Sequence, residues 1–128
     1  MKQILTRAAL LAAAIVLPVA AFAAPIEGKW KNAKGTVVVN VAPCGGGHCG
    51  TVAWASPHNR GEGVTPGTRV LTDLRPAGDG TYSGRAFEPK RGIAGSATVR
   101  QAGPNVMVVR ACAIMGLICK EQRWTRVS

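Results

Sequence analysis

The chain has 128 residues, of which 47% are apolar and 5% aromatic, and its formal net charge is +10. The length leaves room for one domain, and no charge run, repeat or linker indicates a second. Few aromatic side chains are present to stack on bases, so we expect no nucleic-acid partner. The basicity suits anionic partners such as lipid head groups or acidic ligands, although it also suits a merely soluble, solvated surface.

The first 23 residues have the pattern of a secretory signal peptide. Lys2 and Arg7 form a positive start, an apolar run follows over 8–16, and Ala21-Phe22-Ala23 fits the small-x-small cleavage rule. A membrane anchor is the rival interpretation, but Pro18 interrupts the apolar run. We therefore expect a cleaved signal helix over 1–23 and a single domain over 24–128. The mature protein would be periplasmic or secreted, with a formal charge of +8 and no stable membrane insertion.

Short β-rich runs separated by glycine, proline and asparagine follow the leader, with no strong helix signal. A long polar loop is predicted over 56–68, and Asp79-Gly80 indicates a tight hairpin turn. The predicted strands cover residues 28–32, 35–43, 48–55, 69–76, 81–89, 93–101, 106–112 and 119–127.

These strands and their short connections predict an all-β fold. The connections are too short for parallel crossovers, so the strands are expected to be antiparallel. Closing an up-and-down meander of about eight strands into a small barrel removes its edge strands. Such a barrel has room for its own side chains or for one small ligand.

The four cysteines are spaced as Cys44-x4-Cys49 and Cys112-x6-Cys119. In an oxidising compartment they favour disulfides, and the local pairing is the simplest of the three that four cysteines allow. A zinc site built from Cys44, His48, Cys49 and one later cysteine is the alternative, but its spacing is not that of a standard zinc knuckle. We expect structural disulfides, no metal and no cofactor.

Two segments carry a resemblance to known families. Gly28-Lys29-Trp30 and Arg126 resemble the lipocalin and calycin signature, in which an arginine of a late strand packs over the tryptophan ring. The chain from 26 to 127 resembles the bacterial domain-of-unknown-function family 2147, most specifically in QRWTRV at 122–127. The resemblance implies a small exported lipocalin-like barrel and structural roles for Gly28, Trp30 and Arg126.

The first functional interpretation is a barrel that holds a small, partly apolar ligand in its mouth. Loop 56–68 would serve as a lid, and arginines beside the mouth would meet an anionic group of the ligand. The aromatic and methionine candidates also suit core positions, because eight strands leave little spare volume. The candidate ligand-binding residues are Trp54, Arg69, Tyr82, Arg85, Phe87, Met107 and Trp124.

The second interpretation is a cell-envelope protein with a solid barrel whose basic outer face binds a protein or an anionic envelope component. An enzyme is not expected, because the sequence has no hydrolase elbow, phosphate-binding loop or metal signature. No oligomeric state is predicted. The candidate outer-face residues are Lys29, Lys31, Lys34, Lys90, Arg91 and Arg100.

Overall fold

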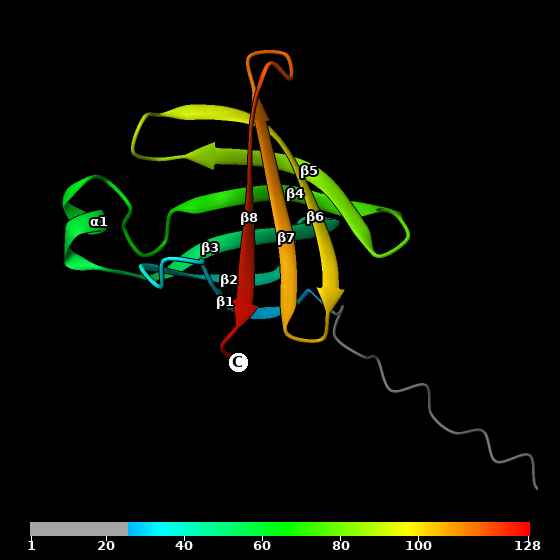
Figure 1. Ribbon diagram of the computed structural model, residues 1–128, viewed down its shortest axis with the longest axis horizontal. Helices are drawn as coiled ribbons and strands as arrows, with labels where there is room; N and C mark the ends of the chain where they lie inside the picture. The colour runs from blue at the N-terminus through cyan, green and yellow to red at the C-terminus, as the bar shows by residue number, and fades with distance from the viewer. Residues whose placement is uncertain (1–25) are drawn as a thin grey trace, which may run out of the picture.

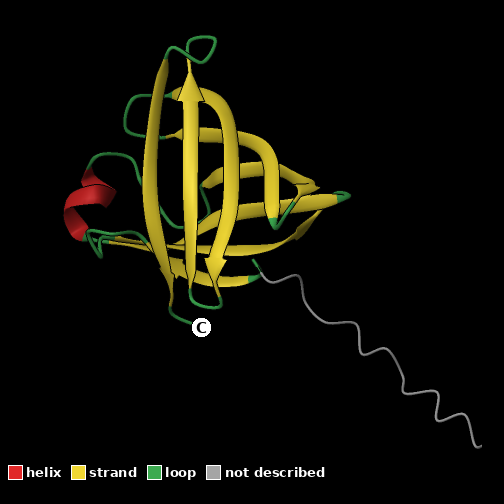
Figure 2. Ribbon diagram, turned by 45° about the vertical axis from the view of Figure 1, so that its right-hand side comes forward, coloured by secondary structure: helices red, strands yellow, loops and turns green. Residues whose placement is uncertain are grey.

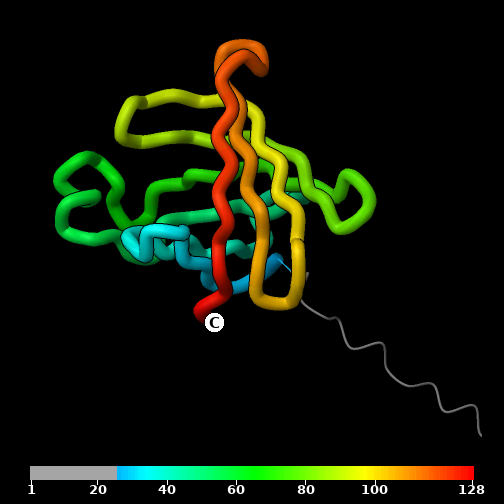
Figure 3. Tube along the Cα trace, in the orientation of Figure 1, coloured from blue at the N-terminus to red at the C-terminus, as the bar shows by residue number. Residues whose placement is uncertain are grey.

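The computed structural model describes residues 26–128, which form a closed antiparallel barrel of eight strands (Figure 1). The predicted leader over 1–23 lies outside the described residues. Each strand pairs with its neighbours in the chain, and β8 pairs back with β1 (Figure 3). The strands are β1 (Gly28–Lys31), β2 (Val37–Cys44), β3 (Gly47–Ala55), β4 (Arg69–Gly78), β5 (Thr81–Glu88), β6 (Ile93–Gly103), β7 (Val106–Ala113) and β8 (Ile118–Arg126).

The predicted all-β, up-and-down barrel is confirmed, and each predicted strand overlaps an observed one. The predicted Asp-Gly turn joins β4 to β5, where Asp79 and Gly80 have φ of 51° and 71°. Positive φ at both central residues gives the turn a twist that matches the twist of the paired strands. Within residues 26–128, no helix has the length and apolar character needed to cross a bilayer.

The predicted polar loop over 56–68 contains a short helix that the sequence analysis missed, α1 (Pro57–Gly61) (Figure 2). Ser56 caps the helix, because its hydroxyl accepts a hydrogen bond from the backbone N–H of Asn59 at 3.3 Å. Pro57 supplies the fixed φ that suits a first helical turn. One capped turn is a local signal, and a search for hydrophobic periodicity does not detect it.

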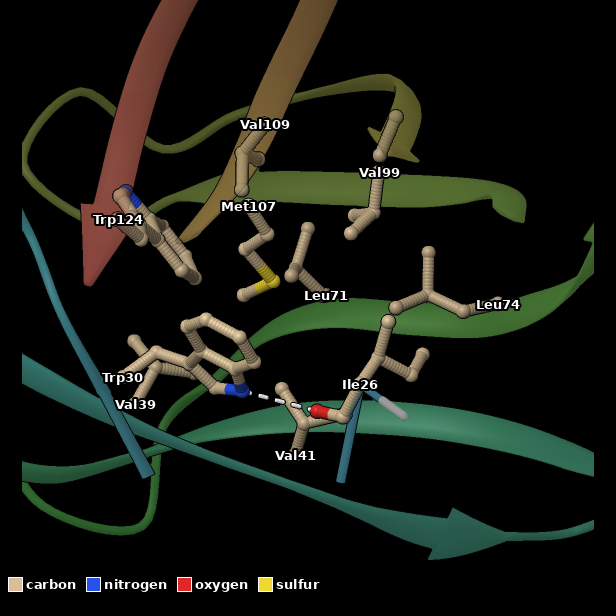
Figure 4. Packing of buried hydrophobic residues seen from close by; sticks show 11 residues of the cluster. Ile26, Trp30, Val39, Val41, Leu71, Leu74, Val99, Met107, Val109 and Trp124 are labelled. Atoms are coloured by element: carbon tan, nitrogen blue, oxygen red, sulfur yellow. Dashed lines mark hydrogen bonds between the residues drawn. The ribbon is translucent and has the colours of Figure 1, made fainter. Parts of the chain in front are cut away.

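Apolar side chains at alternate strand positions fill the barrel at the end where β1 begins and β8 ends, here called the closed end. The tightly buried residues include Trp30, Leu74 and Met107, each 0% exposed (Figure 4). Val39 and Val41 of β2 face the same core, as the period of two in a strand requires.

The N-terminal segment closes this end of the barrel. The indole N–H of Trp30 donates to the carbonyl of Ile26 at 2.9 Å (Figure 4), and Ile26 is itself 0% exposed. The guanidinium of Arg126 lies 4.3 Å from the Trp30 ring centroid. Its Nη1 donates to the carbonyl of Glu27 at 2.6 Å, and its Nε donates to that of Pro104 at 3.0 Å. The tryptophan–arginine contact implied by the family resemblance is therefore present.

Gly28 is required at this closure for two reasons. Its φ is +126°, which side-chain-bearing residues rarely adopt. A Cβ at this position would also lie 2.6 Å from Arg126 Nη1 and 2.5 Å from the carbonyl oxygen of Ser128. Glycine thus allows β1 to approach the segment that follows β8.

Both disulfides have the local pairing, Cys44–Cys49 and Cys112–Cys119. The first joins β2 to β3 near the closed end, across a turn in which Gly45 and Gly46 have positive φ. The second joins β7 to β8 at the opposite end. All four cysteines are bonded in this way, so none is a free thiolate that could bind zinc as in the alternative interpretation.

We expect Arg126→Ala to lower the melting temperature by roughly 10 °C or more. The substitution removes a cation–π contact and charged hydrogen bonds that together contribute on the order of 2–4 kcal/mol. Arg100→Ala is the matched control, because Arg100 is exposed on β6. Thermal unfolding followed by circular dichroism compares the two, and equal shifts would contradict the closing role of Arg126.

We expect Cys44→Ser to reduce the free energy of unfolding by about 2 kcal/mol, the chain-entropy estimate for a ring this small. The fold should persist, because the barrel core does not depend on this hairpin. Urea titration of the oxidised protein measures the loss. A variant as stable as the parent would show that the disulfide has no structural effect.

Candidate functional site

The barrel is hollow at the end opposite Trp30 and Arg126. An inner cavity of about 200 Å³ lies between the parts of strands β4 to β8 that are at this end of the barrel. An outer cavity of about 600 Å³ is bounded by the β1–β2 turn, α1 and the β5–β6 hairpin. The two share seven lining residues, including Val70, Gln122 and Trp124, so they form one continuous space. We call this space the mouth.

The mouth is hollow because the inward side chains become smaller toward this end. On β7, Met107 and Val109 pack in the core, whereas Ala111 lines the inner cavity. On β5 and β6, the paired residues Ala86 and Gly95 also line the inner cavity. A Cβ on Gly95 would collide with the carbonyl of Cys112, so this position cannot carry a side chain without a backbone shift. Because the inward side chains become smaller, those of the barrel wall leave a space at this end that they do not fill.

Strand β8 brings polar groups to this apolar space. Lys120, Gln122 and Trp124 are alternate residues of the strand, and all three line both cavities. The Trp124 indole N–H donates to Gln122 Oε1 at 3.0 Å. Trp124 is only 8% exposed, so it forms the floor of the mouth, while Lys120 stands at its rim.

The rim of the mouth is cationic. Four basic side chains and one acidic side chain line the two cavities, namely Lys34, Lys90, Arg91, Lys120 and Glu88. The Glu88 carboxylate accepts the backbone N–H groups of Lys90 at 3.1 Å and of Arg91 at 2.9 Å. The two N–H dipoles partly offset its negative charge, and the basic side chains outnumber it around the mouth.

An ion pair connects two sides of the rim. Lys90 Nζ of the β5–β6 hairpin lies 3.0 Å from Glu62 Oε2, beside α1. The imidazole of His58 lies 3.0 Å from the other oxygen of Glu62. The hydrogen bond and charge of Lys90 lower the pKa of the Glu62 carboxyl, with a smaller contribution from His58. The predicted lid segment is thus held to the opposite hairpin.

Only two of the seven predicted ligand-binding residues, Phe87 and Trp124, line the mouth. Met107 lies in the core among Trp30, Leu71 and Trp124 (Figure 4). Tyr82 faces inward four residues from Ala86, toward the closed end, where it forms a T-shaped contact with His48, with ring centroids 6.1 Å apart. The structure places the remaining three outside the mouth: Trp54, Arg69 and Arg85 are exposed.

The candidate outer-face residues separate into two groups. Lys34, Lys90 and Arg91 line the mouth. Lys29, Lys31 and Arg100 are exposed on the barrel wall.

Lys120 and Gln122 were missed by the sequence analysis, although a signal was present. They have the same strand parity as Trp124 and Arg126, and Arg126 was expected to lie over Trp30 within the barrel. Extending that alternation back along β8 places Lys120 and Gln122 on the inner face. Their polarity makes an inward position look unfavourable unless the barrel is known to be open at this end.

We expect acid to release the contact between α1 and the β5–β6 hairpin. A carboxyl with a lowered folded-state pKa stabilises its contacts above its ordinary value of 4.5, and that stabilisation is lost as pH falls through the folded-state pKa. Amides over 58–63 and 89–92 should therefore exchange faster at pH 3 than at pH 6, after correction for intrinsic rates. Lys90→Gln should reduce this difference over 58–63 without abolishing it, because His58 still pairs with Glu62. A difference over 58–63 equal to that of the parent would contradict the role of the Lys90–Glu62 pair.

The chain matches a family described as "Uncharacterized protein conserved in bacteria (DUF2147)" over residues 28–126. No curated protein and no solved structure matches it. The matched segment begins at Gly28 and ends at Arg126, the residues that meet at the closed end. It therefore contains the whole barrel, and the chain belongs to this bacterial family.

Proposed function

We propose that the protein is an exported carrier that binds a small amphipathic anion in the barrel mouth. The observation that carries this proposal is an apolar compartment that opens onto a cationic rim. One end of the ligand would be hydrocarbon and the other a carboxylate or a phosphate.

The inner cavity supports the apolar half of the proposal. Leu71, Ala86, Val109 and Ala111 line it, and Trp124 forms its floor. Apolar cavities with a few convergent polar groups are the usual form of small-molecule sites, with volumes of about 300–1,000 Å³. The inner cavity of about 200 Å³ and the adjoining outer cavity of about 600 Å³ together suit a ligand of modest size.

The rim supports the anionic half. Lys120 and Arg91 line both cavities, at the place where a ligand seated against Trp124 would leave the apolar compartment. The arginine fork suits a carboxylate or phosphate through paired hydrogen bonds, and a lysine supplies a point charge. Glu88, which lies nearby, already accepts two backbone N–H groups and so opposes an anion less than a free carboxylate would.

Export is supported by the leader pattern over 1–23 and by the two disulfides, because disulfides form and persist in oxidising compartments. We also propose that the ligand leaves unchanged. The mouth lacks a nucleophile paired with a base within the described residues, and its histidine, His58, is bound to Glu62 at the exposed rim.

The proposal is tested by titrating the mature protein with dodecanoate while tryptophan fluorescence is recorded, because Trp124 lies at the floor of the mouth. We expect saturable binding of dodecanoate and much weaker binding of dodecanol, which lacks the charge. Lys120→Gln should weaken dodecanoate binding roughly fivefold, since an exposed ion pair contributes up to about 1 kcal/mol. Ala111→Phe should abolish binding by filling the inner cavity.

Lys29→Gln is the matched control, because it removes the same charge from the outer wall of β1. Melting temperatures identify any variant that fails to fold. Equal loss of affinity in Lys29→Gln and Lys120→Gln, or equal binding of dodecanoate and dodecanol, would contradict a cationic rim that selects anions.

A second candidate function is binding of an anionic envelope component by the outer wall. One observation favours it: Arg100 of β6 and Arg123 of β8 both pair with Val108 of β7, so the two exposed arginines lie on one outer surface. Under this function, dodecanoate would not bind, and lipopolysaccharide binding would fall when both arginines are replaced by glutamine.

A further inference from the structure

Beyond the ligand site, we infer that the turn between β7 and β8 docks the protein onto an anionic lipid surface, with the barrel mouth facing that surface. The turn together with the adjoining strand residue on each side, residues 113–118, is here called the apolar tip. It consists of Ala113, Ile114, Met115, Gly116, Leu117 and Ile118 and carries no polar side chain.

The apolar tip is unusually exposed for its composition. Ile114 is 60% exposed, Met115 102% and Leu117 82%. The tip stands clear of the rest of the barrel in Figures 1 and 2. Contiguous exposed apolar groups of this kind mark sites where a protein meets another apolar phase.

The backbone of the tip holds these side chains outward at a conformational cost. Ile114 and Met115 have φ of 52° and 54°, in the left-handed region. A β-branched residue is rare there, and asparagine or glycine would adopt the same turn without strain. The Cys112–Cys119 disulfide closes the base of the turn. Strain retained at an exposed site indicates that the side chains serve a purpose other than folding.

The exposed apolar groups are concentrated at the mouth end. Of the eight large hydrophobic residues that are exposed within residues 26–128, six lie on the tip or on the neighbouring β5–β6 hairpin, where Phe87 and Ile93 are located. The hairpin turns at the closed end instead contain Gly45-Gly46, Asp79-Gly80 and Pro104-Asn105. The asymmetry distinguishes one pole of the barrel from the other.

The charge beside the tip identifies the occupant as a lipid surface with anionic head groups. The inner cavity is lined at once by Ala113 and Ile118 of the tip and by the cations Arg91 and Lys120. An apolar tip flanked by cations matches a bilayer interface, in which hydrocarbon lies beneath anionic head groups. Anionic head groups can meet the rim cations that a ligand in the mouth does not occupy, such as Lys34, whereas a purely apolar protein partner offers them no negative charge.

The test is co-sedimentation with vesicles of phosphatidylcholine mixed with phosphatidylglycerol, compared with phosphatidylcholine alone. We expect the mature protein to bind the mixed vesicles and to bind them less as salt rises. The triple variant Ile114→Ser, Met115→Ser, Leu117→Ser should lower the partition coefficient at least about tenfold, because the apolar area available for insertion is removed.

Val127→Ser is the matched control, because Val127 is an exposed apolar residue that follows β8 at the opposite pole. It should bind vesicles as the parent does. Met115→Asp is a second tip variant that keeps the test valid if the triple variant unfolds, since the Met115 side chain is fully exposed. It should weaken binding several-fold with an unchanged melting temperature.

Hydrogen exchange should show protection of amides over 113–118 when mixed vesicles are added. Failure of the parent protein to bind mixed vesicles would overturn the inference and would favour a protein partner. Equal binding by the parent and the folded tip variants would also overturn it. Because Ala111→Phe fills the inner cavity but leaves the tip intact, that variant should still bind vesicles, which separates this inference from the ligand-binding proposal.

Discussion

The contact between Arg126 and Trp30 determines which end of the barrel is closed. The guanidinium covers the indole ring and at the same time binds the carbonyls of Glu27 and Pro104. It thereby joins the segment before β1, the end of β8 and the β6–β7 hairpin. Since this end is filled by Ile26 and Trp30, an opening for a ligand can exist only at the other end. The location of the mouth follows from where the barrel is sealed.

The composition of the strands then gives the mouth its character. Inward side chains decrease in size from Met107 to Ala111 along β7, which leaves an apolar space above Trp124. The cations do not come from the barrel wall alone: Lys120 lies on β8, whereas Arg91 lies in the β5–β6 hairpin. Apolar surface and positive charge therefore meet where the strands end, and the same pole carries the apolar tip. Ligand uptake and lipid docking are proposed for one face of the molecule.

Much of the fold could be predicted from the sequence because its determinants are local. Strand alternation, the Asp79-Gly80 turn and the two short cysteine spacings each specify structure over a few residues. The site was harder to predict, because it depends on which barrel end is open. Side-chain size and apolar character alone suggested Tyr82 and Met107, yet their positions along the strands place them toward the closed end and in the core. Lys120 could be found only by combining strand parity with knowledge of the opening.

The short seam between β1 and β8 has a consequence for how the protein folds. Its ladder pairs Trp30 with Arg126 and Lys31 with Thr125, and backbone hydrogen bonds between Lys29 and residues 127–128 extend it. These partners are separated by nearly the full length of the family match. Contacts so distant in sequence form late, because a long loop must be closed first. Until β8 reaches β1, the meander is an open sheet with two unpaired edges and an uncovered apolar face. The protein is thus most prone to aggregation during the last step of its assembly, when a chaperone that shields sheet edges would have the greatest effect on yield.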